Sequence, residues 1–400
     1  MLFLWLWCWI SESEPGGASV IMRVAYPKRI DALDKSDGNL FHVLQYVERG
    51  KKPREDARPR FEGTVIPDLS AGLSSIDLVH LTNINRPVDT HSAFLSARAA
   101  QNTIIFSFIH HSYREVERYE RAGGDGVVGQ ISDLLGFTAL EYLRCSVRGR
   151  SNSGLLTPML KSMSVDMKTS QHTIVKGANR ILVLSEDKIG ILYGFGEVPD
   201  NKCICLRNGP EDRSGTYIDR KIDVCVVGLI EARKYQIAVL DALNRRGISG
   251  VFVGAEDPNQ KAYCHCFKKM IADSPSTYLG GISREEALQI IRRFIVHVSN
   301  SWFEALLPAD LEAYCVGCGV VASNCGGTRE VLGERAVYVN PESGESIVDG
   351  ITRMLEKMSG DISDRAEERA GKPISETWKL VGGRLYEIYR QTVGQSGFNG

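Results

Sequence analysis

The sequence predicts an α/β protein made of two doubly wound domains. The first observation is length, because 400 residues exceed what one hydrophobic core usually organises. The second is the alternation, from residue 222 onward, of short apolar runs with amphipathic helical patterns. Strands that are apolar along their length and separated by helices indicate a parallel sheet that is buried on both faces.

The second half of the chain carries the clearer pattern. Its helical segments, such as KYQIAVLDALNRRG and SREEALQIIRRF, place apolar residues three and four positions apart. We assign residues 211–373 to this domain. Its predicted strands are 222–228, 250–255, 276–280, 294–299, 319–323 and 336–340.

The first half, residues 22–210, repeats this alternation less regularly. A long helical excursion is expected from 130 to 176, and the turn-rich segment 207–221 is interpreted as the linker. A final amphipathic helix over 374–393 is expected to dock on a domain surface. The predicted strands of this half are 22–27, 76–81, 103–109, 180–185 and 202–206.

The N-terminus and the composition bear on location and partners. The apolar run within residues 1–21 is about ten residues long, too short to span a bilayer, so we interpret this segment as a non-native or poorly ordered leader. An interfacial anchor is the alternative, which would add a peripheral contact at the inner face of a membrane. Acidic and basic residues nearly cancel, 49 against 48, which argues against a nucleic-acid partner.

Cysteine usage indicates a reducing compartment, and hence a cytoplasmic protein. The ten cysteines are scattered instead of forming a compact disulfide framework, and we interpret the close pairs as buried free thiols. These pairs are Cys203 with Cys205, Cys264 with Cys266, and Cys315 with Cys318.

A glycine-rich stretch, GGDGVVG at 123–129, contains the spacing G-x-G-x-x-G. The dinucleotide fingerprint requires a strand before these glycines and a helix opening from them. Here the preceding segment has the pattern of a charged helix, so we interpret the stretch as a loop, with a phosphate site as the alternative.

Two carboxylates, Glu304 and Glu312, stand out in the stretch SWFEALLPADLEAYCVGCGVVASNCGGTREVL, residues 301–332. Pro308 suits the first position of a helix, so Glu304 should lie in the preceding loop and Glu312 in the first turns. Such a helix start, at the carboxyl end of a parallel strand, is where α/β sheets bind ligands and anions. The alternatives are a solvated loop acid for Glu304 and an acid stabilised by the helix dipole for Glu312.

This stretch resembles the donor-binding core of retaining glycosyltransferases of family 4, also called glycosyltransferase group 1. The shared features are S-x-x-E, a second glutamate after seven residues, a VVAS strand and GGTREV. The resemblance covers residues 23–393 and implies the GT-B fold, with two Rossmann-like domains facing a central cleft and the last helix crossing back to the first domain. Further similar segments are VVGLIEARK (226–234), ANRILVLSE (178–186), RNGPED (207–212) and DGNLFHV (37–43).

The resemblance also implies roles for individual residues. Glu312 would accept hydrogen bonds from the ribose of a nucleotide-sugar, and Glu304 would lie beside the transferring sugar. Lys234 would neutralise the departing diphosphate, and His110, with His111 as the alternative, would face the sugar. The implied catalytic residues are therefore Glu304 and His110, and the implied donor-binding residues are Glu312, Lys234, Arg233, Gly228, Leu307, Ala309, Gly38 and Asn39.

The chain departs from the family pattern at several donor-contact positions. Leu229 stands where an arginine is common, which leaves Arg233 as a substitute. Leu307 and Pro308 stand where the family has a glycine-leucine pair, and Pro308 has no N–H with which to bind a phosphate. The N–H of Ala309 and the helix dipole remain available, and Asn39 replaces a usual glycine.

The function predicted on these grounds is that of a retaining glycosyltransferase of the hexosyltransferase type. It would move a sugar from a nucleotide-diphosphate sugar to a hydroxyl of a glycan, a lipid-linked acceptor or a small molecule. No cofactor is expected, because the nucleotide-sugar is a substrate and no Asp-x-Asp occupies a loop suited to hold a metal.

Two other functions are weighed against this prediction. A non-catalytic nucleotide- or sugar-binding protein of the same fold is one alternative, because Leu229 and Pro308 alter donor-contact positions. A nicotinamide-dependent dehydrogenase is the other, but it should carry a glycine fingerprint after strand 22–27 or 222–228, and neither strand is followed by one.

Overall fold

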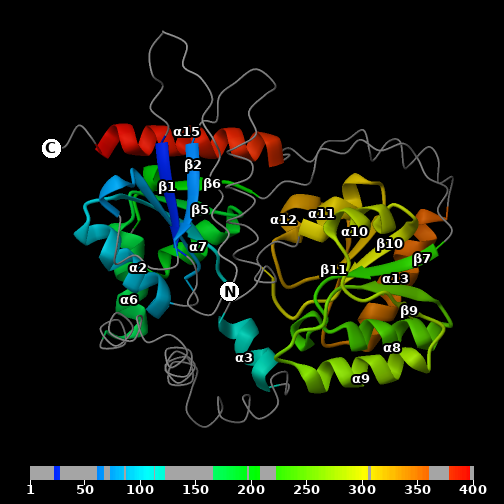
Figure 1. Ribbon diagram of the computed structural model, residues 1–400. Coiled ribbons are helices and arrows are strands. Elements are labelled where there is room, and N and C mark those ends of the chain that lie inside the picture. Colours follow the sequence, from blue (N-terminus) through cyan, green and yellow to red (C-terminus); the bar gives the residue numbers. More distant parts are fainter. Residues whose placement is uncertain are drawn as a thin grey trace.

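The computed structural model shows two α/β domains side by side (Figure 1). It describes residues 22–27, 61–66, 73–84, 87–111, 113–121, 165–195, 198–207, 222–304, 308–359 and 378–396. Each domain contains a six-stranded sheet, and every strand pair in both sheets is parallel. The predicted pair of doubly wound domains is confirmed.

In the first domain the strand order is β2-β1-β3-β4-β5-β6. Apolar clusters cover both faces of this sheet, as expected for continuous hydrophobic strands. The described strands are β1 (Met22–Pro27), β2 (Phe61–Ile66), β3 (Leu78–Thr82), β4 (Thr103–Phe108), β5 (Arg180–Val183) and β6 (Cys203–Cys205), and the described helices are η1 (Leu73–Ser75), α2 (Pro87–Ala99), α3 (Tyr113–Arg121), α6 (Met167–Gly177), α7 (Asp187–Tyr193) and η3 (Asp200–Lys202).

In the second domain the order is β12-β11-β10-β7-β8-β9, so the winding direction reverses between β7 and β10. Ligands of open α/β sheets bind at the carboxyl ends of strands at such a reversal. The strands are β7 (Ile222–Val227), β8 (Gly250–Val253), β9 (Thr277–Tyr278), β10 (Phe294–Ser299), β11 (Gly319–Ser323) and β12 (Val337–Val339), and the described helices are η4 (Ala232–Lys234), α8 (Gln236–Arg246), α9 (Lys261–Ala272), α10 (Arg284–Ile291), α11 (Pro308–Cys315), α12 (Thr328–Leu332), η5 (Gly333–Arg335) and α13 (Gly344–Met358).

The structure differs from the sequence predictions in three places. Strand β2 was not predicted; it pairs with β1 at the edge of the sheet, and its FEGTVI sequence has a charge and a glycine in its first half. The last helix, α15, is described over Trp378–Ser396, so it ends beyond the predicted residue 393, and its predicted start at 374 lies outside the described residues. The prediction that the paired cysteines are buried is confirmed for Cys264 and Cys318 and wrong for the exposed Cys266, although every cysteine that the structure describes is a free thiol. The other three are partly buried: Cys203, Cys205 and Cys315.

Other predictions lie outside the described residues. These are the leader over 1–21, the loop over 123–129, nearly all of the linker and most of the helical excursion, of which the structure describes the end as α6.

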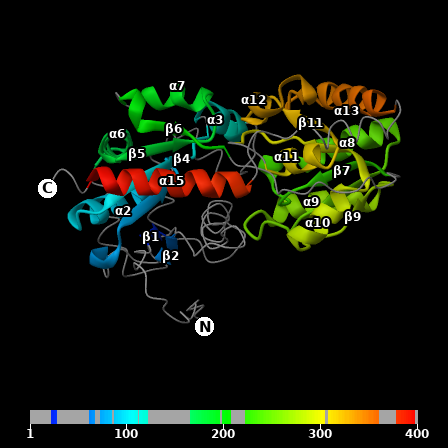
Figure 2. The same ribbon diagram turned by 90° about the horizontal axis from the view of Figure 1, so that it is seen from above.

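Helix α15 belongs to the first domain in space, although it follows the second domain in sequence (Figures 1 and 2). Its apolar residues Val381, Leu385 and Tyr389 are fully buried in one cluster with β1 and β3. Tyr389 also closes a buried polar group, because its hydroxyl lies 2.5 Å from His80 Nδ1 and 3.0 Å from the hydroxyl of Tyr26. This packing confirms the expected return of the last helix.

The burial of His80 predicts a pH dependence of stability. Burial lowers the pKa of His80 from 6.5 to about 3, so the folded protein keeps this ring neutral while the unfolded chain is protonated below about pH 6.5. The stability contribution is therefore complete above pH 6.5 and is lost as the pH falls, by about 2 kcal/mol at pH 5. Denaturant unfolding at pH 7 and pH 5 should show this loss in the wild type. It should shrink in a His80→Gln variant, and an equal loss in both proteins would contradict the prediction.

Side chains from the first domain contact the second through α3 and through β6. Tyr119 of α3 packs against Trp302 and Phe303, with ring centroids 6.0 and 5.7 Å apart. Arg207, just after β6, donates to Glu330 of α12 at 2.6 Å. These contacts place the first domain against the segment that carries Glu304.

Candidate functional site

The candidate site lies where β7 and β10 end, at the reversal of the second sheet. After β7 the chain passes Gly228 and Leu229 and enters the short helix η4, which carries Arg233 and Lys234. After β10 it continues to Glu304 and then to α11. A backbone hydrogen bond of 2.9 Å from the Trp302 N–H to the Arg233 carbonyl joins the two segments.

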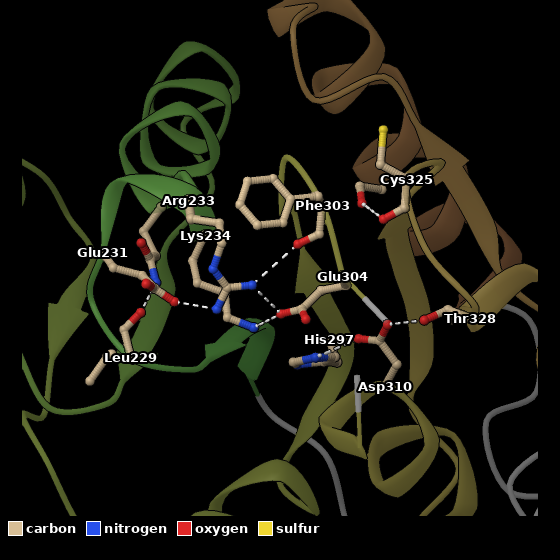
Figure 3. Close-up of polar contacts among 12 residues, drawn as sticks. Leu229, Glu231, Arg233, Lys234, His297, Phe303, Glu304, Asp310, Cys325 and Thr328 are labelled. Carbon is tan, nitrogen blue, oxygen red and sulfur yellow. Dashed lines mark hydrogen bonds and ion pairs between the residues drawn. The ribbon is translucent and has the colours of Figure 1, made fainter. Parts of the chain in front are cut away.

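Glu304 contacts both cations that follow β7 (Figure 3). Arg233 Nη1 donates to Glu304 Oε1 at 2.9 Å and to the Phe303 carbonyl at 3.2 Å. Lys234 Nζ donates to the same carboxylate oxygen. The guanidinium also holds Glu231 Oε1 at 2.5 Å, so Arg233 bridges two acids.

The charges in this cluster stabilise one another. Burial alone would raise the pKa of Glu304, but the positive charges of Arg233 and Lys234 outweigh it and hold that pKa well below the usual range of a glutamate. Burial would likewise lower the pKa of Arg233, whereas Glu304 and Glu231 raise it. Glu304 is therefore an anion at neutral pH, and together with Glu231 it balances the charges of Arg233 and Lys234.

Two glycines lie against this cluster. Lys234 extends over Gly228, where an added Cβ would be 3.8 Å from Lys234 Cε. Gly326, in the turn before α12, has φ +150°, and a Cβ there would be 3.1 Å from the Glu304 carbonyl oxygen. The glycine turn therefore packs directly against the backbone of Glu304.

Helix α11 begins at Pro308, as predicted, and it carries the second glutamate. Glu304 precedes the helix, and Glu312 is buried within it, with an exposed fraction of 7%. Ala309 is half-buried in the first turn, where backbone N–H groups have no partner within the helix. The predicted placement of both acids relative to the helix start is confirmed.

From the first domain, the structure brings His111 to the Glu304 segment. Its ring lies 5.3 Å from that of Phe303, the residue before Glu304. His110 is also buried, but it stacks on Phe108 and contacts Phe195, both from its own domain. The catalytic role of His110 stays a prediction, and of the two histidines the alternative, His111, is the one shown in contact with Phe303.

The remaining predicted site residues give a mixed outcome. Gly38, Asn39 and Leu307 lie outside the described residues. Leu229, in the position expected for an arginine, accepts a hydrogen bond of 2.6 Å from Gln236 Nε2 through its carbonyl.

Among the described residues no cluster of histidine, cysteine and acidic side chains suits a metal ion, and no helix is long and apolar enough to cross a membrane.

Sequence reasoning missed a second polar cluster directly beside this site. It consists of His297 on β10, Asp310 on α11 and Thr328 at the start of α12 (Figure 3). A signal was present, since a histidine inside an apolar strand and an acid in a helix start are costly to bury without partners. Glu231 was missed too, because one acid in a loop carries no pattern.

Comparison with known proteins finds a family that the second domain resembles. Residues 210–372 match the family described as Glycosyl transferases group 1. This part of the chain is similar to that family. No sequence among the curated proteins matches the chain.

Solved structures resemble the whole chain and show its fold. Sucrose-phosphate synthase from Thermosynechococcus elongatus has a TM-score of 0.65 at 14% identity, over 94% of this chain and 100% of that one. A glycosyltransferase from Rickettsia africae has a TM-score of 0.63 at 12% identity, over 94% and 99%. HepE from Anabaena, solved with UDP and glucose, has a TM-score of 0.55 at 12% identity, over 94% and 99%. The chain therefore has the GT-B fold, and its similarity to the group 1 family lies in the second half.

Proposed function

We propose that this protein is a retaining glycosyltransferase of the hexosyltransferase type, using a nucleotide-diphosphate sugar as donor and a hydroxyl of a glycan, lipid-linked or small-molecule acceptor. One observation carries the proposal. Two adjacent cations, Arg233 and Lys234, face Glu304 at the strand reversal of a domain similar to the group 1 family. This arrangement offers concentrated positive charge to a diphosphate where α/β sheets bind ligands.

The two cations suit the departure of a diphosphate. As the bond between the sugar's anomeric carbon and the diphosphate breaks, negative charge grows on the leaving oxygen, and nearby fixed cations lower the energy of that state. Arg233 supplies the second positive charge, because Leu229, which stands where an arginine is common, carries none. In the absence of donor Glu304 pairs with both cations, and Glu231 pairs with Arg233, so a diphosphate would take over part of their hydrogen bonding.

The carboxylates then serve different ends of the donor. Glu312 accepts hydrogen bonds from the ribose, and Glu304, freed in part from its cations, orients the transferring sugar. The acceptor oxygen forms its bond on the face from which the diphosphate leaves, and its proton passes to the leaving phosphate oxygen. This route retains the anomeric configuration and requires neither a side-chain nucleophile nor a metal cofactor.

Two further observations support parts of this proposal. HepE, which shares the fold, was solved with UDP and glucose, and this favours a nucleotide-sugar as the donor class. The scattered free thiols favour a cytoplasmic setting. On the acceptor side, His110 or His111 of the first domain would face the sugar, with Gly38, Asn39 and Leu307 completing the donor contacts.

Substitution of Glu312 tests the donor assignment. Glu312→Ala should weaken binding of UDP or the matching nucleoside diphosphate by about 1.5–3 kcal/mol, the value of a hydrogen-bonded charged group. Isothermal titration calorimetry measures this change. Glu345→Ala is the matched control, because Glu345 is likewise a helical glutamate of this domain but is exposed, in the first turn of α13. Unchanged affinity in a folded Glu312→Ala protein would refute the ribose contact.

Nucleotide release separates the enzyme from a binding protein. Purified protein incubated with a panel of nucleotide-sugars and candidate acceptors should release the nucleoside diphosphate, and the product should retain the donor's anomeric configuration by NMR. A donor that binds without release under any of these conditions would favour the non-catalytic alternative.

A further inference from the structure

A buried polar chain runs directly under the Glu304 loop, and the function proposed above does not use it. Thr328 donates its hydroxyl proton to Asp310 Oδ2 at 2.7 Å, and Asp310 Oδ1 lies 3.2 Å from His297 Nε2. On the far side of the ring, His297 Nδ1 lies 3.8 Å from the sulfur of Cys225 on β7. Exposed fractions are 0% for His297, 1% for Asp310 and 5% for Thr328, so water does not solvate these three side chains.

These linked side chains connect β10, α11 and α12, the three segments that meet at the site (Figure 3). His297 lies on β10, two residues before that strand ends and the Glu304 loop begins. Asp310 lies in the first turn of α11, two residues before Glu312. Thr328 is the first residue of α12 and directly follows the glycine turn that packs on Glu304.

The chemistry of the chain favours a positioning role. A carboxylate without water is costly unless it is paired, and here the start of α11, the hydroxyl of Thr328 and the ring of His297 surround it. Within the described residues Asp310 Oδ1 and His297 Nε2 form no hydrogen bond, so the two atoms are in close contact without a directional link. The hydrogen bond from Thr328 is therefore the directional link between α11 and the glycine turn.

We infer that Thr328 and Asp310, supported by His297, are positioning residues that hold the glycine turn against Glu304 and so set the carboxylate's orientation. This inference rests on the proposed function for its catalytic consequence. Loss of the link would let the turn at Gly326 move away from the Glu304 backbone. Glu304 would then lose its defined approach to Arg233 and Lys234, although no ligand contact is removed.

The test compares Thr328→Val with two other variants. Thr328→Val removes the hydroxyl with little change of shape, and Thr328→Ser keeps the hydroxyl. Thr352→Val is the matched control, since the Thr352 hydroxyl donates at 2.9 Å to the Val348 carbonyl within α13 and lies outside this network. Thr328→Val should lower kcat about tenfold with KM for the donor within about twofold, while the other two variants stay near the wild type.

A double-mutant cycle distinguishes positioning of Glu304 from loss of stability. If Thr328 acts through Glu304, then Thr328→Val should change kcat by less than about twofold in a Glu304→Gln background. The same tenfold loss in both backgrounds would overturn the inference, because the hydroxyl would then act independently of Glu304.

Hydrogen exchange of the intact protein tests the link without any assay of transfer. Thr328→Val should speed backbone exchange in peptides that contain residues 300–304 and 324–328, and Thr352→Val should leave both unchanged. Unaltered exchange around Glu304 in Thr328→Val would overturn the inference whatever the activity. If the wild type transfers no sugar while exchange responds as expected, the proposed function fails and the structural link stands.

Discussion

Glu304→Gln is expected to lower turnover by about 10²-fold or more, with a smaller change in the Michaelis constant for the donor. The amide keeps the size of the side chain but removes the charge that two cations hold. A neutral group can no longer orient and stabilise a sugar that becomes positive as the diphosphate leaves. Steady-state kinetics with a true acceptor measures the effect, since hydrolysis alone reports a different step.

The same variant should bind a nucleoside diphosphate at least as tightly as the wild type. With Glu304 neutral, Lys234 and the Nη1 side of Arg233 lose a competing anion and are available to phosphate oxygens, while Arg233 keeps its pair with Glu231. Asp241→Asn is the matched control, because it removes a carboxylate from an exposed ion pair with Arg245 on α8. Near-normal turnover in Glu304→Gln would show that the site is organised around backbone N–H groups instead, an outcome that a sharp gain in Pro308→Gly would reinforce.

Lys234→Met is expected to lower kcat by about 10²–10³-fold, the usual cost of removing one group that stabilises charge in the transition state. Methionine preserves most of the length and apolar surface of the lysine, so the contact over Gly228 can persist. Arg233 remains 2.9 Å from Glu304, and the carboxylate therefore keeps a partner when Lys234 is lost. Turnover should be measured at saturating donor, where a loss of ground-state affinity cannot produce the effect.

A second lysine controls for the loss of charge itself. Lys268→Met removes a positive charge from α9, where Lys268 pairs with Glu256 at 3.0 Å and half of its side chain is exposed. This variant should retain wild-type kcat. If Lys234→Met also retained it, the leaving diphosphate would have to be stabilised elsewhere, and Arg233 with the first turn of α11 would be the next groups to substitute.

Local patterns in the sequence determined most of the fold. Continuous apolar runs separated by 3.6-residue periodicity located eleven of the twelve strands that the structure describes to within about two residues, and they predicted that both sheets are parallel. The edge strand β2 was not predicted, because half of FEGTVI is polar or small and its hydrophobic pattern is too weak to detect. Pro308 predicted the start of α11, because a proline costs nothing where a helix N–H has no partner.

Resemblance to a family supplied the candidate roles of the site residues, and their contacts required the folded chain. Arg233 and Glu304 are separated by 71 positions, and no periodicity links a loop after β7 to a loop after β10. Their pairing exists because parallel strands that are distant in sequence end at the same edge of one sheet. The choice between His110 and His111 likewise depends on how the first domain packs, since Phe303 meets only the second histidine among the contacts shown.

The network of His297, Asp310 and Thr328 was decided by tertiary structure alone. Each residue has an ordinary local explanation in the sequence, as a strand residue, a helix-dipole acid and a helix-start threonine. Only the packing of α11 and α12 over β10 excludes water from all three, and without water a carboxylate must find partners within the protein. The sequence by itself therefore determined which elements form and which acids flank the start of α11, whereas the approach of those elements decided which charges neutralise one another.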